Sequence, residues 1–273
     1  MIRIHIIAGR YAIVRATSFR TMSLGVYNNP KYYDIAFSFR DPIREVAFFE
    51  RLTKKYSRFK VRNILELAAG NSPYARELVR QGYRYVGLEL STAMIRFAKV
   101  QARQEKFPAS YVCADMKRFA LSKKFDFAFV LLGSLYVKSD AELKSHLSSV
   151  SRVLRPGALY VLEGVVQFFP GEIRRQSWTM TNGGGRITTT YTPQLFDKSN
   201  NIWQEKLSLR IANPAKKPTI IEHREYKKRY RIKEFLQFIK HDGRFEYVGD
   251  FSNFHLSSRA IRGARNILVL RRK

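Results

Sequence analysis

Short apolar runs alternate with helical patterns through the middle of the chain. The runs at 64–67, 83–88 and 158–163 have the length of strands and are bounded by small or turn-forming residues. Strands that alternate with helices in this way form a largely parallel sheet with helices on both faces. The pattern therefore predicts an α/β fold whose strand–helix core covers residues 61–170.

The helices between these strands have recognisable ends. Pro73 is expected in the first turn of the helix that follows the first strand, and Gly82 ends it. Ser139 and Glu142 form a capping box for a later helix whose apolar residues recur every three or four positions. The Pro-Gly pair at 156–157 is expected to end that helix before the next strand.

The pattern changes on both sides of this core. Residues 171–231 contain Thr- and aromatic-rich runs separated by turns, which predict antiparallel strands. Residues 232–273 predict a last helix and a closing antiparallel pair of strands that complete the core sheet. Before the core, Asp41 precedes an amphipathic helix. Its expected apolar stripe consists of Ile43, Val46, Ala47 and Phe49.

Two carboxylates mark the ends of the first two strands. Glu66 is the last but one residue of the run at 64–67, and Glu89 follows 23 residues later at the end of the next strand. In dinucleotide-binding folds an acid about 20 residues after the first loop binds the ribose hydroxyls. The loop after Glu66 lacks the G-x-G-x-x-G pattern of a phosphate-binding loop, since only Gly70 is without a side chain. These features indicate a ligand with a ribose but without a pyrophosphate.

The segment Ile64–Ser72 resembles motif I of the class I S-adenosyl-L-methionine (SAM)-dependent methyltransferases, with Glu66-x-Ala68-x-Gly70-x-Ser72 in place of E/D-x-G-x-G-x-G. Segments 86–99, 111–119, 125–137 and 154–163 resemble the four motifs that follow in this family. The resemblance implies that Glu89 binds the ribose, Asp115 the adenine amine and Arg40 the methionine carboxylate. The other implied cofactor-binding residues are Glu66, Ala68, Gly70, Asn71, Leu90, Met116 and Leu132.

Residues that face the methyl acceptor are expected in two places. The resemblance makes residues 22–60 an N-terminal lid that contributes Tyr33, and it places Ser134 and Tyr136 after the fourth strand. Amino-sugar N,N-dimethyltransferases share several of these motifs, but their histidine after this strand is replaced by Val137.

The fourth motif is LLGS rather than the N/D-P-P-Y/F of enzymes that methylate nucleic-acid amines. The only cysteine, Cys113, is expected to be an inert thiol in a buried strand, so covalent attack on a pyrimidine is not predicted.

The resemblance therefore implies a Rossmann-like, seven-stranded, mostly parallel sheet with an antiparallel β cap inserted before the last helix. The implied reaction moves a methyl group from SAM to a nitrogen or oxygen of a small molecule. One alternative is a catalytically degenerate SAM-binding protein, prompted by the motif I glycines replaced by Ala68 and Ser72. The sequence leaves the acceptor and the oligomeric state open.

The net charge of +28 prompts a second alternative, an RNA methyltransferase. The surplus of Lys and Arg over acids is spread along the chain: 8 in residues 1–60, 7 in 61–166, 2 in 167–200 and 11 in 201–273. A diffuse surplus is more typical of a solvated surface. One predicted strand has a basic face, formed by Lys227, Arg229, Arg231 and Lys233, which alternate with Tyr226, Tyr230 and Ile232. This face is interpreted either as a phosphate-binding surface or, preferably, as an outer face that points to solvent. A nucleic-acid partner is thus the less favoured alternative.

The remaining expectations concern metals, membranes and location. The five histidines show no spacing typical of metal ligands, and no apolar run is long enough for a membrane span. The single cysteine fits a reducing, cytoplasmic location. Residues 1–21 are expected to lie outside the core. They are interpreted either as a mitochondrial presequence or, preferably, as the region before a true start at Met22.

Overall fold

A seven-stranded sheet forms the centre of the computed structural model, which describes residues 25–182, 185–213 and 216–273. Its strands lie in the order β12 (Phe245–Ser252), β13 (Asn266–Arg272), β5 (Leu154–Glu163), β4 (Phe125–Val130), β1 (Asn63–Leu67), β2 (Arg84–Glu89) and β3 (Ser110–Cys113). Neighbouring strands from β5 to β3 are parallel, whereas β13 is antiparallel to both β5 and β12. The predicted α/β class and the mostly parallel sheet are confirmed.

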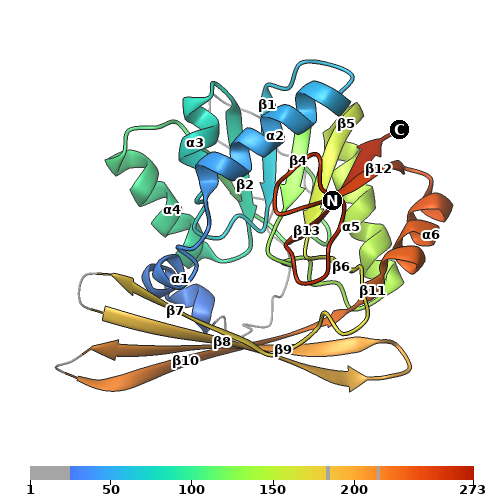
Figure 1. Ribbon diagram of the computed structural model, residues 1–273. Coiled ribbons are helices and arrows are strands. Elements are labelled where there is room, and N and C mark those ends of the chain that lie inside the picture. The colour runs from blue at the N-terminus through green and yellow to red at the C-terminus, as the bar shows by residue number, and fades with distance from the viewer. Residues whose placement is uncertain (1–24, 183–184, 214–215) are drawn as a thin grey trace, which may run out of the picture.

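Helices cover both faces of this sheet (Figure 1). They are η1 (Val26–Asn28), α1 (Pro30–Ala36), α2 (Pro42–Tyr56), α3 (Ala75–Arg80), α4 (Thr92–Gln104), α5 (Asp140–Val153) and α6 (Ile232–Asp242). Because successive strand residues point to opposite faces, Phe127 and Phe129 of β4 pack with α2 and α3, while Ala128 and Val130 pack with α5. Two apolar layers therefore hold the sheet in place and expose only its edges.

Two of the expected helix boundaries are wrong by a few residues. Helix α3 begins at Ala75, two residues after Pro73. Helix α5 ends at Val153, and strand β5 already includes Pro156 and Gly157. The register between β4 and β5 shifts at this point, and Gly157 adopts a φ of +88°. The Pro-Gly pair therefore makes a bulge in a strand instead of separating a helix from a strand.

Helix α2 buries a different stripe from the one expected. Ile43 is 66% exposed, because it lies on the side of the helix that points away from the sheet. The side chains that pack against the core are Val46, Phe48, Phe49 and Leu52. Phe49 stacks near Phe127 and Phe129 of β4, at centroid distances of 5.3 and 5.0 Å. Helix α2 is thus part of a core layer, and the lid role of residues 22–60 stays a prediction.

A second, four-stranded antiparallel sheet lies across the end of the core at which the parallel strands finish (Figure 1). Its strands are β10 (Lys216–Lys228), β9 (Ile202–Asn213), β8 (Gly185–Asp197) and β7 (Gln176–Asn182). The short parallel strands β6 (Val166–Gln167) and β11 (Tyr230–Arg231) link it to β5 and α6. Helix α1 packs against β7 and β8, between the cap and the core. The antiparallel cap before the last helix is confirmed.

Three expectations concern other parts of the chain. Cys113 is exposed, contrary to the prediction, because it is the last residue of the edge strand β3. In the described part of the chain, no helix is long and apolar enough to cross a membrane. Residues 1–21 and the Met22 start lie outside the described residues, and the predicted domain boundaries remain predictions.

Candidate active site

The loop after β1 keeps the backbone shape of a glycine-rich loop although two of its glycines are replaced. Ala68, Gly70 and Ser72 have φ values of 52°, 56° and 54°. The left-handed region costs a residue with a Cβ about 1–2 kcal/mol. Hydrogen bonds from Ser72 N to Ala69 O (2.8 Å) and between Ser72 Oγ and the Tyr85 hydroxyl (2.9 Å) hold the loop in this shape.

Glu89 lies at the end of β2, directly beside this loop. Its two carboxylate oxygens accept separate hydrogen bonds, from Gly70 N (2.9 Å) and Ser91 N (2.7 Å). Burial raises the pKa of Glu89, and the hydrogen bonds from backbone N–H groups partly oppose this shift. Each oxygen has lone pairs left, so the carboxylate is fixed in place and can still accept from two neighbouring hydroxyls.

Glu66 is buried beneath the loop and is not oriented by a cation. The Tyr85 hydroxyl donates to its Oε2. Burial raises the pKa of Glu66 to about 8, although the hydrogen bond from Tyr85 and the charge of Arg40 lower it. At neutral pH the Glu66 side chain is therefore mainly protonated, which fits a role in organising the loop.

Arg40 and Asn71 tie the segment before α2 to the same loop. Arg40 Nη2 donates to Asn71 Oδ1 over 3.2 Å, and Arg40 Nε donates to Phe37 O over 2.9 Å. Asn71 Nδ2 in turn donates to Asp34 Oδ1. The guanidinium therefore lies beside the loop, where it can pair with an anionic group of a ligand.

Leu90, Asp115 and Met116 form the outer part of this edge. Leu90 is 43% exposed, and Cys113 Sγ contacts its carbonyl at 3.5 Å. Asp115 Oδ1 accepts from Lys117 N over 2.8 Å and so caps a turn, while its carboxylate stays partly exposed. This edge therefore presents apolar side chains and one carboxylate to solvent.

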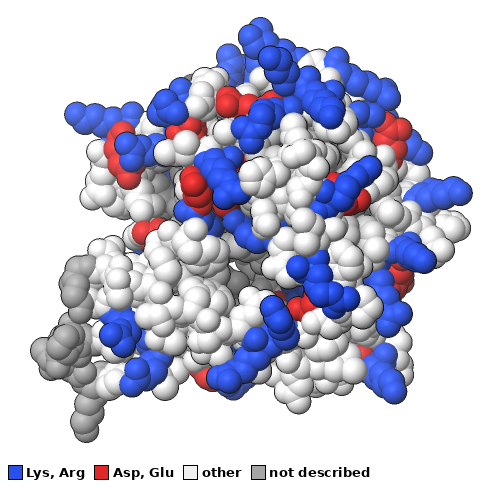
Figure 2. All heavy atoms as spheres, viewed as in Figure 1, with Lys and Arg blue, Asp and Glu red and all other residues white. Residues whose placement is uncertain are grey.

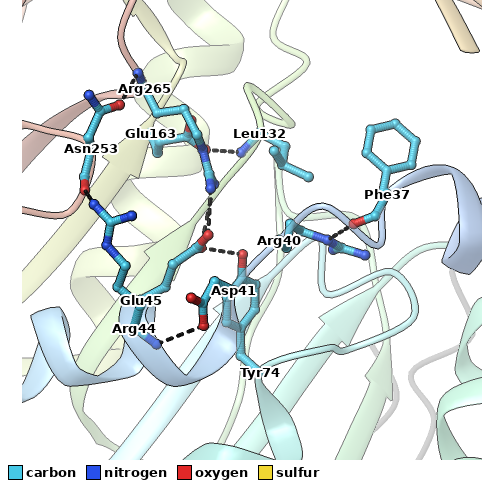
Figure 3. Close-up of polar contacts among 10 residues, drawn as sticks. All are labelled: Phe37, Arg40, Asp41, Arg44, Glu45, Tyr74, Leu132, Glu163, Asn253 and Arg265. Carbon is cyan, nitrogen blue, oxygen red and sulfur yellow. Dashed lines mark hydrogen bonds and ion pairs between the residues drawn. The ribbon is translucent and has the colours of Figure 1, made fainter. Parts of the chain in front are cut away.

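A network of hydrogen bonds and ion pairs fixes the turn after β4 (Figure 3). Its central residue is Arg265, near the C-terminus. Leu132 is left-handed (φ 55°), and its N–H donates to Glu163 Oε2 over 2.5 Å. Arg265 Nε donates to Glu163 Oε1 over 3.1 Å, and Arg265 Nη1 donates to Glu45 Oε1 over 2.5 Å. Burial lowers the pKa of Arg265, but the charges of Glu163 and Glu45 outweigh this effect and raise it overall. One guanidinium thus joins α2, β5 and the turn that Leu132 forms.

A cavity of about 610 Å³ opens between this turn and the cap. It brings together Tyr33, Ser134 and Tyr136, the three residues expected to face the acceptor, and includes Leu132. Much of the wall is aromatic, with Tyr27, Tyr33, Phe37, Tyr136, Trp178 and Tyr191. Tyr33 also approaches the loop after β1, since a Cβ at Gly70 would lie 3.9 Å from its ring. The cavity therefore adjoins the edge that carries Glu66, Gly70 and Glu89, although these residues do not line it.

The structure adds a charged group from the cap that the sequence analysis placed wrongly. Lys227 is only 3% exposed, so the basic face of β10 points inward at this position, not to solvent. Lys227 Nζ donates to Gly133 O over 2.7 Å and pairs with Glu205 Oε2 at 3.2 Å. Burial and the nearby Arg229 lower the pKa of Lys227 to about 8, although Glu205 raises it.

Arg229 completes this group. Its Nη2 donates to Glu205 Oε1 and, over 2.7 Å, to the Tyr191 hydroxyl. Burial raises the pKa of Glu205, but Lys227 and Arg229 outweigh it and keep that pKa below its usual value. The sequence did contain a signal, because residues 223, 225, 227 and 229 alternate as His, Glu, Lys and Arg along one strand. Which sheet face they occupy depends on the packing of the cap.

In the described part of the chain, no cluster of three or more His, Cys, Asp or Glu side chains is arranged to hold a metal ion. Residues 64–157 match a protein family described as a methyltransferase domain. A protein from Geobacillus sp. (strain WCH70) that is inferred to be a methyltransferase is 22% identical over 118 residues. That match covers 43% of this chain and 48% of the other, so the chain spans about half the length of this curated relative.

Three solved structures are similar over nearly the whole fold. A SAM-dependent methyltransferase from Clostridium acetobutylicum has a TM-score of 0.73 and 13% identity, and the match covers 90% of this chain and 98% of the other. The sugar N-methyltransferase KedS8 from Streptoalloteichus has a TM-score of 0.70 and 19% identity, covering 97% and 100%. CalS10, an amino pentose methyltransferase from Micromonospora echinaspora that was solved with SAM, has a TM-score of 0.68 and 17% identity, covering 94% and 100%.

At these identities the three structures establish the fold and not the substrate. The family match, in contrast, covers β1 to the start of β5, which is the part that carries the loop, Glu89 and the turn after β4. Residues 64–157 are therefore similar to a methyltransferase domain, and the chain as a whole has a Rossmann-like fold similar to that of the three solved methyltransferases.

Proposed function

We propose that the protein transfers a methyl group from SAM to a nitrogen or oxygen atom of a small-molecule acceptor. One observation carries this proposal: the loop with Gly70 and Glu89 directly adjoins an aromatic cavity of about 610 Å³ that the cap covers. A nucleoside ligand at the first site and an acceptor in the second would meet near Tyr33.

The residues at the edge of the core sheet fit SAM. Glu89 offers a fixed carboxylate to the two ribose hydroxyls, and the left-handed loop around Gly70 keeps side chains away from the ligand. Arg40, which lies beside the loop, would pair with the methionine carboxylate, and Asp115 would accept from the adenine amine. Leu90 and Met116 supply the apolar surface that the base would contact.

Methyl transfer from SAM requires little of the protein beyond aligning the methyl group with the acceptor atom. The bound cofactor supplies a methyl group that its positively charged sulfur already activates. The aromatic wall around Tyr33 and Tyr136 keeps water out, and the turn at Leu132–Gly133 sets the position of Ser134. Lys227 holds this turn through Gly133 O. Its pKa of about 8 leaves Nζ mainly protonated at neutral pH, which agrees with its ion pair to Glu205.

A small acceptor is favoured because the cap forms one wall of the cavity. Two of the structural relatives are described as sugar or amino pentose methyltransferases, which supports an acceptor of similar size. Val137, which replaces the histidine of the amino-sugar enzymes, is 2% exposed and packs in the core. The acceptor of this protein is therefore expected to rely on other contacts, such as those of Ser134 and Tyr136.

One observation bears on the degenerate alternative. It was prompted by Ala68 and Ser72, and both residues adopt the left-handed conformation that glycine would provide. The replaced glycines therefore do not prevent a left-handed backbone in this loop.

Two measurements test the proposal. Calorimetric titration should show binding of both SAM and S-adenosylhomocysteine; no binding to the folded protein at millimolar ligand would contradict it. Incubation with methyl-labelled SAM and separate RNA and metabolite fractions should place the label in the metabolite fraction. Label in RNA would favour the RNA alternative, and binding without any transfer would favour the degenerate one.

A further inference from the structure

A second cavity, of about 830 Å³, lies at the opposite edge of the core sheet, where β1 and β2 begin. It is a surface groove formed by the end of α2, the loop at 57–62 and the turn at 81–84. Figure 2 shows basic side chains gathered at this end of the molecule, away from the cap. Nothing in the proposed methyl transfer uses this groove.

The charge of the groove is strongly one-sided. Five cations line it, and Glu50 is the one acid among its lining residues. The five are Lys54, Arg58, Lys60, Arg62 and Arg84. All five side chains are exposed, and Arg62 and Arg84 are held next to each other by a hydrogen bond from Arg84 N to Arg62 O (2.8 Å).

Most of these five cations have no carboxylate partner among the residues that the structure describes. Within the described ranges, Arg58 has a carboxylate nearby, at 3.5 Å from Glu246, whereas the side chains of Lys54, Lys60, Arg62 and Arg84 take part in no hydrogen bond or ion pair. On the cap, in contrast, Lys206 and Arg224 share Glu222, and Lys228 pairs with Asp140. The groove therefore holds a local surplus of positive charge that the protein does not neutralise itself.

Two aromatic rings distinguish the groove from a plain basic surface. Phe59 and Tyr83 line it and are each half-buried, so part of each ring faces the hollow. Sites for single-stranded nucleic acid combine a positive groove, which follows the phosphates, with rings on which unpaired bases stack. A duplex hides its bases from such rings, and a flat lipid surface does not fill a groove.

We propose that this groove binds a single-stranded nucleic acid segment, with phosphates on the five cations and bases against Phe59 and Tyr83. The site lies at the end of the sheet opposite to Glu89, so binding does not require turnover at the methyl-transfer site. A transferase could thus be held on a nucleic acid while it acts on a small molecule. The proposal stands or falls independently of the proposed function.

The test uses the full chain and a fluorescein-labelled twelve-nucleotide oligouridine RNA, followed by fluorescence anisotropy at several salt concentrations. Five phosphate contacts predict a slope of log K against log [salt] of about −3.5. Arg62→Gln/Arg84→Gln should weaken binding at least tenfold and reduce the slope by about 1.4. Tyr83→Leu should weaken binding about fivefold with an unchanged slope, because it removes stacking and no charge.

The matched control is Lys233→Gln/Lys240→Gln, which removes the same charge from exposed positions on α6. This variant should bind the RNA within twofold of wild type, and equal weakening by both double variants would overturn the proposal. It would also be overturned if polyglutamate, anionic lipid vesicles or duplex RNA bound as tightly as the single strand. Thermal unfolding of each variant shows whether the fold is retained.

Discussion

Carboxylates near the cavity are held in opposite ways in the core and in the cap. On the core side, Glu66 and Glu89 accept hydrogen bonds from uncharged donors, a tyrosine hydroxyl and two backbone N–H groups. On the cap side, Glu205 lies between two cations, Lys227 and Arg229. Glu89 keeps capacity to accept from a ligand, whereas the charge of Glu205 is already compensated within the protein.

This difference separates a binding role from a structural one. A carboxylate oriented by neutral donors can contact a ligand's hydroxyl or ammonium groups without first breaking an ion pair. A buried carboxylate between two cations mainly stabilises the arrangement around it, because loss of either partner leaves a buried charge. We therefore expect changes on the core side to affect the cofactor, and changes at Glu205 to affect folding.

The largest effect is expected at Glu89. Glu89→Ala removes two charge-assisted contacts to the ribose and should weaken SAM binding about 1,000-fold, or roughly 4 kcal/mol, by calorimetry. The control is Glu105→Ala, which removes an exposed carboxylate paired with Arg76 and should change affinity less than twofold. If Glu89→Ala binds SAM like wild type, the carboxylate does not hold the ribose.

Glu205→Gln should lower the free energy of unfolding by about 3 kcal/mol, because Lys227 and Arg229 then share a buried site without an anion. Urea unfolding measures this. Adding Lys227→Met should recover part of the loss. Glu222→Gln, on the exposed face of the same sheet, is the control and should cost less than about 0.5 kcal/mol. Equal losses of unfolding free energy in both variants would show that the ion pairs of Glu205 stabilise the fold no more than an exposed ion pair does.

The pKa of Glu66 predicts how stability depends on pH. It is about 8 in the folded protein against 4.5 as the ordinary value, so between these values the folded state binds more protons than the unfolded chain. The stabilising contribution of Glu66 is complete below pH 4.5 and is lost as the pH rises through 8. Between pH 5.5 and pH 7 the loss should be about 2 kcal/mol.

Glu66→Gln removes this titration but keeps an oxygen that can accept from Tyr85. The variant should therefore gain stability relative to wild type as the pH rises, measured by urea unfolding at both pH values. Parallel pH profiles for the two proteins would show that Glu66 is ionised when folded.

The smallest effect is expected in the loop itself. Ala68→Gly relieves a left-handed alanine but frees the unfolded chain, so the net change should lie between zero and about 1 kcal/mol of added stability. Ala69→Gly is a matched control, since Ala69 is buried and is not left-handed; it should cost about 1 kcal/mol. A loss at Ala68 as large as the loss at Ala69 would contradict the strain argument.

The arrangement on the core side was predictable because it depends on residues that are close together in the sequence. Strand periodicity places Glu66 and Glu89 at the ends of neighbouring parallel strands, and this placement alone brings them to one edge of the sheet. The left-handed backbone at Ala68 and Ser72 was not readable in the same way, because neither residue favours it. The hydrogen bonds of the folded loop impose it.

Helix α2 shows the limit of periodicity. The amphipathic pattern indicated the helix, yet several neighbouring stripes were compatible with it. Ile43 proved exposed, and Phe48 and Leu52 proved buried. The direction from which the sheet approaches the helix selects the stripe, and that direction is a property of the assembled core.

By itself the sequence determined the strand–helix order, the mostly parallel sheet, the acids at its edge and the antiparallel nature of residues 171–231. These features depend on residues close together in the chain. Only the tertiary structure decided that Lys227 and Arg229 face inward, because a strand with alternating side chains can present either face to the core. The pairing with Glu205 on the neighbouring strand and the contact with Gly133, 94 residues away, settle that choice.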